Sequence, residues 1–234
     1  SKLPGSKTSI FSVMSKMANQ YEAINLSQGF PNFETDQKLK DLVTKAMKDG
    51  YNQYPPDAGV LELREMISRK FNDLYGKYYK PETEITITSG ATEALYNSIT
   101  AFVQKGDEVI VLKPAYDSYE PTIQLAGGIP VQIQLKGSDY KVDWEDVAKA
   151  ITNRTRMIII NTPHNPTGTV LSKEDMLKLQ KLLKDTNIIL LSDEVYQHLI
   201  FDGRLHQSAS RFPELSKRSI VCGSFGKTFH NTGW

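Results

Sequence analysis

Residues 157–168 read MIIINTPHNPTG, an apolar run followed directly by polar and turn-forming residues. Similar β-type runs recur along the chain, and most are followed by turn residues and then by a helical pattern. They lie at 85–88, 109–112, 131–135, 157–160, 188–191 and 219–222. Strands that are buried on both faces and alternate with helices are typical of an α/β protein with a mainly parallel sheet. We therefore predict an α/β fold in which helices flank such a sheet.

Two segments between these runs have the apolar period of a helix that buries one face. Residues 91–103 carry apolar side chains on one face and stop before Gly106. Residues 172–184 repeat this design after Ser172 and Asp175, which form a capping-box signature. Both segments are therefore predicted to be helices that cover the sheet.

The chain before residue 85 follows a different pattern. Helical periodicity covers residues 39–47 and 63–74, with a loop rich in Tyr, Asn and Pro between them. An apolar stripe from Ile10 to Tyr21 has the spacing of a helix face, typical of a core or subunit contact. We predict that residues 1–45 form an N-terminal arm and part of a small domain, and that residues 46–234 form the large α/β domain.

Composition excludes several classes of protein. The net charge of +1 gives no reason to expect a nucleic-acid partner. The longest apolar runs are far shorter than the roughly 18 residues of a membrane helix, so no membrane is expected. Cys222 is the single cysteine and cannot form a disulfide within the chain, which favours the cytoplasm. The four histidines have no metal-ligand spacing, so no metal site is predicted.

Polar segments follow four of the runs, at the edge where an open α/β sheet binds its ligands. Each segment alone has an ordinary explanation: a packing glycine, a rigid turn, a helix-capping aspartate or a solvated lysine. The first segment places small residues at a helix start, where the helix dipole favours an anion such as phosphate. The segments are Ser89-Gly90-Ala91-Thr92, Asn161 to Gly168, Ser192-Asp193-Glu194-Val195-Tyr196 and Gly223-Ser224-Phe225-Gly226-Lys227-Thr228.

Together these segments provide a phosphate site, an Asn, an Asp, a Tyr and a Lys on one edge of one sheet. Pyridoxal phosphate chemistry requires this set. A lysine amine holds the cofactor as an imine and moves a proton at the substrate α-carbon, and a carboxylate keeps the pyridine nitrogen protonated. Hydrogen bonds from Asn and Tyr stabilise the anion of the ring hydroxyl. The combination therefore predicts a site for pyridoxal 5'-phosphate.

The segments at 89–94, 161–168, 192–196 and 224–234 closely resemble those of class I pyridoxal-phosphate aminotransferases of fold type I. The resemblance extends over nearly the whole chain. Within that family, NLSQGFP at 25–31 and FGKTF at 225–229 are most similar to the methionine aminotransferase and kynurenine aminotransferase branch.

The resemblance implies a role for each matching residue. Lys227 bonds the cofactor, Asp193 pairs with the pyridine nitrogen, and Asn165 and Tyr196 contact the ring hydroxyl. The catalytic residues are then Lys227, Asp193 and Tyr196. The other implied contacts are with the phosphate (Gly90, Ala91, Thr92 and Ser224), the face of the ring (Tyr116), the substrate (Gly29 and Asn165) and the phosphate of the partner subunit (Tyr54).

Three of these assignments have plain alternatives. Tyr116 lies close to Tyr119 and can pack locally in its loop. Gly29 can serve only a turn, and Tyr54, before two prolines, can belong to ordinary loop packing.

The resemblance implies a homodimeric aminotransferase that moves an amino group from an amino acid, methionine or an aromatic one such as kynurenine, to a 2-oxo acid. One alternative is a cysteine-conjugate β-lyase, although similar lyases usually carry His at the position of Tyr196. Another is a regulator that only senses the cofactor, although such proteins carry an added basic DNA-binding module.

The resembling proteins continue beyond the position of Trp234 and carry, in a C-terminal small domain, the arginine that binds the substrate carboxylate. We therefore expect these 234 residues to be a segment of a longer protein.

Overall fold

The structure, a computed structural model, describes residues 2–3, 8–29 and 31–234. The chain divides into two compact units, Ser1–Tyr51 and Asn52–Trp234. The boundary predicted near residue 45 falls inside a helix of the first unit. The assignment of that unit to a small domain stays a prediction.

The first unit contains helices α1 (Ile10–Gln20) and α2 (Gln37–Lys48). Side chains cap both starts: Ser9 accepts the N–H of Phe11, and Asp36 accepts the N–H of Lys38 at 2.8 Å. The predicted apolar stripe therefore does lie on a helix, α1. No residue of α1 or α2 is buried, so the apolar side chains of this stripe are exposed or only partly covered.

The second unit is built on one parallel sheet with the strand order β2-β1-β3-β4-β5. This confirms the predicted fold class. All five strands coincide with apolar runs found in the sequence. Their bounds are β1 (Glu108–Lys113), β2 (Ile129–Gln134), β3 (Thr155–Asn161), β4 (Ile189–Asp193) and β5 (Ser219–Cys222).

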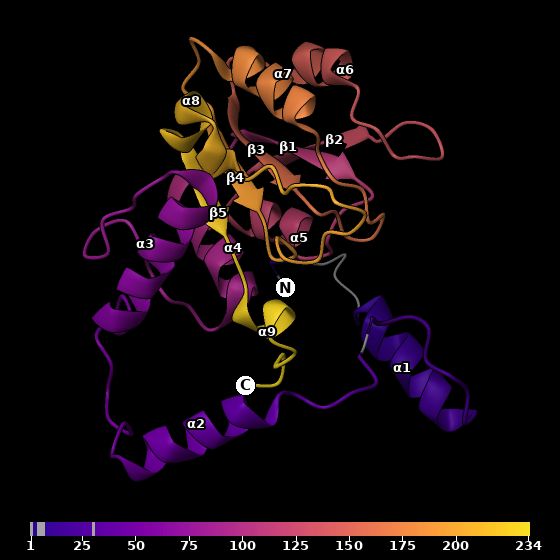
Figure 1. Cartoon of the computed structure of the whole chain (residues 1–234). Coiled ribbons are helices and arrows are strands. Elements are labelled where there is room, and N and C mark those ends of the chain that lie inside the picture. Colours follow the sequence, from indigo (N-terminus) through magenta and orange to yellow (C-terminus); the bar gives the residue numbers. More distant parts are fainter. Residues whose placement is uncertain (1, 4–7, 30) are drawn as a thin grey trace. The chain divides into compact units, whose positions relative to one another are not determined.

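Helices cover both faces of the sheet (Figure 1). Successive side chains of a strand point to opposite faces, so Ile158 and Ile160 of β3 pack in one core cluster while Met157 and Ile159 pack in the other. Burial of each such side chain contributes about 1.5–3 kcal/mol. One face is covered by α4 (Gly90–Phe102) and α5 (Tyr119–Leu125), the other by α6 (Trp144–Ala150), α7 (Lys173–Leu183) and α8 (Pro213–Ser216).

Three further elements complete this unit. Helix α3 (Leu61–Tyr75) ends at Gly76, whose φ of 69° is a left-handed conformation that favours glycine. The 3-10 helix η1 (Ala209–Arg211) precedes α8, and α9 (Phe225–Thr228) follows β5.

The prediction of a strand at residues 85–88 is wrong. The N–H of Ile87 donates to the carbonyl of Ala58 at 3.0 Å, so this segment bonds to the loop before α3 and joins no ladder of the sheet. An apolar run becomes a strand only where a neighbouring strand accepts and donates its backbone hydrogen bonds. The helix predicted after it nevertheless forms, as α4.

The start of α7 has the predicted capping box. The Asp175 N–H donates to the Ser172 hydroxyl at 3.1 Å, and the Ser172 N–H donates to the Asp175 carboxylate at 2.9 Å. These two bonds satisfy backbone donors that have no acceptor within the helix.

We expect Ser172→Ala to lower the free energy of unfolding by about 1 kcal/mol, because the Asp175 N–H loses its acceptor. Denaturant titration measures the change. Ser138→Ala, at an exposed loop serine, is the control and should change it by less than about 0.5 kcal/mol. Equal effects of the two substitutions would contradict a capping role.

Candidate active site

Three of the predicted segments leave the sheet at one edge. In the ladders, Asn161 at the end of β3 pairs with Asp193 at the end of β4, and Asp193 pairs with Cys222 at the end of β5. Because the strands are parallel, the residues that follow them emerge side by side. Residues 161–168, 193–196 and 222–228 are therefore neighbours, although they are far apart in sequence.

Asp193 is a buried carboxylate at this edge, with only 3% of its surface exposed. Its two oxygens accept hydrogen bonds from the Tyr119 hydroxyl at 2.5 Å and from the Val195 N–H at 3.2 Å. Burial raises the pKa of Asp193 to about 6, while the hydrogen bonds from Tyr119 and Val195 oppose that rise. No Lys, Arg or His of the described part of the chain forms an ion pair with it. A cationic group would stabilise this carboxylate.

Tyr119 is a member of the site that sequence reasoning missed. It is buried at the start of α5, and burial, followed by the charge of Asp193, raises its pKa well above the ordinary value. The phenol therefore stays protonated and donates to Asp193. The only sequence signal was its position three residues after Tyr116, and this cannot reveal a partner 74 residues away.

Asn161 links two of the predicted segments. Its side-chain amide donates to the carbonyl of Asp193 at 3.0 Å, and its side-chain oxygen accepts the N–H of Asn165 at 2.7 Å. Asn161 is buried and Asn165 is half-buried. The turn that carries Asn165 is therefore fixed to the end of β4.

The first turn of α4 contains Gly90, Ala91 and Thr92. Gly90 has a φ of +80°, and no atom from beyond its chain neighbours and its own helix backbone lies within 4 Å of where its Cβ would stand. The first N–H groups of a helix have no intrahelical acceptor and can bind an anion. The Thr92 hydroxyl lies 3.3 Å from the Tyr116 hydroxyl, so the structure brings the predicted phosphate residues and the predicted ring-stacking tyrosine together.

Glu93 adds an acidic side chain to the same helix start. Its carboxylate accepts the N–H of Ser89 at 2.5 Å. This bond occupies the donor just before the first turn, and the Gly90 N–H donates to the carbonyl of Thr88 at 2.8 Å. The N–H groups that follow in the first turn are therefore the ones left for an anion.

Lys227 lies in α9, directly after β5. Ser224 caps this helix and accepts the Lys227 N–H at 3.2 Å. The Lys227 side chain is exposed, and its Nζ lies 5.8 Å from the centre of the half-buried Tyr196 ring. Burial, and to a lesser extent the charge of Asp193, raises the pKa of Tyr196. The structure thus brings the predicted lysine and tyrosine together.

The structure does not bring two of the predicted residues, Tyr54 and Gly29, together with the other predicted site residues. The Tyr54 side chain is 99% exposed. Gly29 belongs to the first unit and is exposed there. Their roles toward a partner subunit and a substrate stay predictions.

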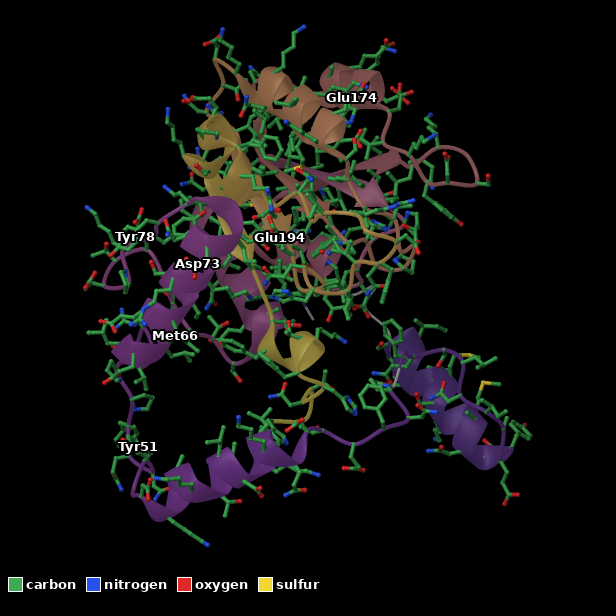
Figure 2. All side chains as sticks on the ribbon, in the orientation of Figure 1. Tyr51, Met66, Asp73, Tyr78, Glu174 and Glu194 are labelled. Carbon is green, nitrogen blue, oxygen red and sulfur yellow. The ribbon has the colours of Figure 1, made fainter. Side chains whose placement is uncertain are left out.

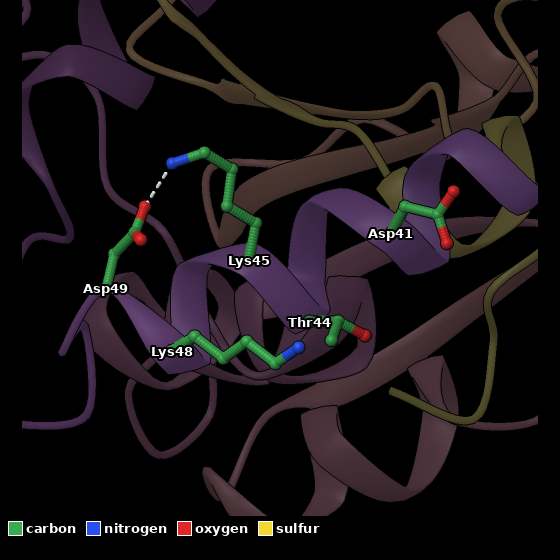
Figure 3. A pocket seen from close by; sticks show the side chains of 5 residues that line it. All are labelled: Asp41, Thr44, Lys45, Lys48 and Asp49. Atoms are coloured by element: carbon green, nitrogen blue, oxygen red, sulfur yellow. Dashed lines mark hydrogen bonds and ion pairs between the residues drawn. The ribbon is translucent and has the colours of Figure 1, made fainter.

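An open hollow on α2 contains none of the predicted residues. It is lined by Asp41, Thr44, Lys45, Lys48 and Asp49, and Lys45 forms an ion pair with Asp49 (Figure 3). The residues that line it come from a single helix and from its C-terminal capping residue. It provides no convergent polar groups for a cofactor.

Two other kinds of feature are absent from the part of the chain that the structure describes. It contains no cluster of three His, Cys, Asp or Glu side chains able to hold a metal ion. It also contains no helix long and apolar enough to span a membrane.

Comparison with known proteins supports the resemblance to aminotransferases. Residues 21–234 match the family model of aminotransferase class I and II. The chain is 46% identical over its whole length to methionine aminotransferase of Escherichia coli and covers 61% of that protein. It is 37% identical to kynurenine–oxoglutarate transaminase of Dictyostelium discoideum, with 97% of this chain and 56% of the relative covered.

Solved structures of aminotransferases also match this chain. The crystal structure of YbdL from Escherichia coli, identified as a methionine aminotransferase, matches with a TM-score of 0.95 over 100% of this chain and 61% of that one, at 46% identity. N-succinyldiaminopimelate aminotransferase from Mycobacterium tuberculosis matches with a TM-score of 0.95 at 38% identity, over 100% of this chain and 62% of that one. The chain therefore spans about 60% of the length of these relatives, and it belongs to the class I and II aminotransferases.

Proposed function

We propose that this protein is a pyridoxal-phosphate-dependent aminotransferase that moves an amino group from an amino acid to a 2-oxo acid. The observation that carries the proposal is the Asp193 carboxylate, which is buried at the end of β4 without a cationic partner among the described residues. Family membership supports the same reaction class, because class I aminotransferases depend on pyridoxal phosphate.

The residues of the edge fit this cofactor. A protonated pyridine nitrogen is the cation that the Asp193 carboxylate lacks. The open space at Gly90 and the first turn of α4 suit a phosphate group. The Lys227 amine is exposed on the same edge and can react with an aldehyde.

When bound, pyridoxal phosphate supplies an electron sink that stabilises negative charge at the substrate α-carbon. Lys227 would hold the cofactor covalently and then carry the proton to and from that carbon. Asp193 would keep the proton on the ring nitrogen, because its charge favours the protonated ring. Asn165 and Tyr196 would donate hydrogen bonds to the ring hydroxyl oxygen, with Tyr116 against the face of the ring.

The surrounding residues would keep these groups in place. Tyr119 donates to the Asp193 carboxylate and favours its charged form. Asn161 fixes the Asn165 turn to the end of β4. Both would act through neighbouring groups, without touching the substrate.

The relatives support an amino donor of the methionine or aromatic class. One is a methionine aminotransferase, another a kynurenine–oxoglutarate transaminase, and a third an aromatic-amino-acid aminotransferase of Thermococcus litoralis. The β-lyase alternative is less favoured, because these relatives are transaminases and Tyr196 stands where similar lyases usually carry His. A cytoplasmic location stays a prediction from the single cysteine.

The central test is transamination by purified protein loaded with pyridoxal phosphate. We expect turnover with methionine or an aromatic amino acid, and a loss of more than about a thousandfold in Lys227→Ala, which has no amine to hold the cofactor or move the proton. Lys217→Ala, at an exposed lysine paired with Glu214, is the control and should keep wild-type activity.

A Lys227→Ala protein that cycles the cofactor at a comparable rate would refute the catalytic assignment. A strong preference for aspartate or alanine, with methionine and aromatic donors inert, would refute only the donor class.

Tyr119→Phe tests the role of the phenol at Asp193. Without this donor the pKa of Asp193 should rise above about 6, so a neutral carboxyl persists to higher pH and cannot balance the charge of the ring nitrogen. We expect cofactor binding to weaken by about tenfold or more near neutral pH and to recover as pH rises. The cofactor dissociation constant, measured from pH 5.5 to 8.5, checks this. Tyr140→Phe, at an exposed loop tyrosine, is the control. An unchanged pH profile in Tyr119→Phe would contradict the role.

A homodimer with shared active sites is also proposed. The fully exposed Tyr54 and the uncovered apolar stripe of α1 are suited to contact with a second copy. Mixing chains that carry Lys227→Ala with chains that carry Tyr54→Phe should produce hybrid dimers with one intact site, and activity well above either parent. Activity that never exceeds the parents after subunit exchange, or a monomeric active protein, would argue against shared sites.

A further inference from the structure

Glu194 is a second buried carboxylate directly after Asp193. None of its surface is exposed, and Figure 2 shows it inside the α/β unit, whereas Glu174 lies on the outside of the same unit. Successive side chains of an extended strand point to opposite faces. The Asp193 side chain accordingly reaches Tyr119 of α5, while the Glu194 side chain reaches the segment that leads into η1.

Protein donors occupy both oxygens of Glu194. Oε1 accepts from the Ser192 hydroxyl at 2.8 Å and from the Ala209 N–H at 2.9 Å. Oε2 lies 2.7 Å from Nε2 of His206, which is itself buried. A buried carboxylate is stable only with such partners. Because its oxygens are engaged in this way, Glu194 is not available to contact a cofactor or substrate.

The bond between Glu194 and His206 closes the loop that carries Tyr196. This loop leaves the sheet at Glu194 and returns to the core at His206, and between them Phe201 and Leu205 are largely exposed. The two buried residues therefore fix both ends of a segment whose residues 201–205 are all exposed. A loop with fixed ends has fewer accessible conformations than one that is free at one end.

A second bond holds the loop on the far side of Tyr196. The hydroxyl of Tyr75, at the end of α3, donates to the side-chain oxygen of the buried Gln197 at 2.8 Å. The Gln197 N–H in turn donates to the carbonyl of Glu194 at 2.9 Å. Tyr196 thus lies between two residues that are tied to other elements.

We propose that Glu194 and His206 are a positioning pair that holds Asp193 and Tyr196 at the places where the cofactor ring needs them. This inference rests on the proposed function, since it assigns the pair a role only toward groups that bind the cofactor. The pair fixes the end of β4 on the side opposite to Tyr119, so that Asp193 is held from both faces of the sheet.

The loss of the Glu194 charge and the loss of its hydrogen bond to His206 predict opposite changes in cofactor affinity for Glu194→Gln. Burial is the main cause that raises the pKa of Asp193, and the charge of Glu194 is a smaller one. Removal of that charge alone would therefore favour ionised Asp193 and tighter cofactor binding. Loss of the bond to His206 would loosen the loop and weaken binding. The direction of the change therefore separates the two effects.

The experiment compares Glu194→Gln and His206→Asn with Glu108→Gln in purified protein loaded with pyridoxal phosphate. Glu108 is a matched control, because it is also a buried carboxylate, paired with Arg154 and accepting from Thr152 at 2.6 Å, but it begins β1 at the other end of the strands. Five quantities are measured: the cofactor dissociation constant, the pH titration of the cofactor absorbance, kcat and KM for the amino donor, and Tm.

We expect both test variants to weaken cofactor retention and to lower kcat by about ten- to a hundredfold, with KM changed by less than about twofold. The midpoint of the absorbance titration should move in both. Glu108→Gln should lower Tm to a similar degree and leave retention, kcat and the titration midpoint at wild-type values.

Wild-type retention, kcat and titration midpoint in Glu194→Gln and His206→Asn would overturn the inference, whatever happens to Tm. If Glu194→Gln fails to fold, His206→Asn decides alone, since it keeps the carboxylate and removes only its partner at the end of the loop. A wild-type protein that binds no pyridoxal phosphate would instead refute the proposed function.

Discussion

Burial of the Asp193 carboxylate is the constraint on which the site depends. The end of β4 places this buried group beside Tyr119, which belongs to one of the two apolar core clusters, and an unsatisfied charge there would cost several kcal/mol. The Tyr119 hydroxyl on α5 and the Val195 N–H donate to it, while burial raises its pKa to about 6. A buried carboxylate without a cationic partner is suited to a cationic ligand group. The pyridine nitrogen of the proposed cofactor is such a group.

The polar side chains around Asp193 are also buried, and burial without a hydrogen-bond partner would be costly for them too. Asn161, Asp193 and Glu194, at the ends of β3 and β4, are buried, and each side chain binds another protein group, as buried polar groups usually do. Asn161 bonds Asp193 and Asn165, while Glu194 bonds Ser192, Ala209 and His206. The result is a layer of hydrogen-bonded side chains at the ends of β3 and β4, in which Nδ1 of His206 has no partner among the described residues. Such a layer keeps reacting groups in place before a ligand arrives, which is how binding energy is used efficiently in catalysis.

Much of the fold could be predicted because its signals are local. The apolar runs of β1 to β5, the period of α4 and α7, and the Ser172–Asp175 capping box all depend on residues a few positions apart. The prediction failed at residues 85–88, where strand formation depends on a neighbour that the run itself does not specify. The boundary predicted near residue 45 lies inside α2, whereas the first compact unit extends to Tyr51, and the division into a small and a large domain stays a prediction.

The sequence by itself determined which reactive residues follow which strands, and so it named Lys227, Asp193, Asn165 and Tyr196 as one set. Only the tertiary structure decided what supports them. Tyr119 meets Asp193 across 74 residues, and Glu194 meets His206 across a loop whose path no motif describes. Hydrogen-bond partners of this kind depend on strand order, on register and on which face a side chain points to. These are properties of the packed sheet, and a pattern in the chain specifies them only indirectly.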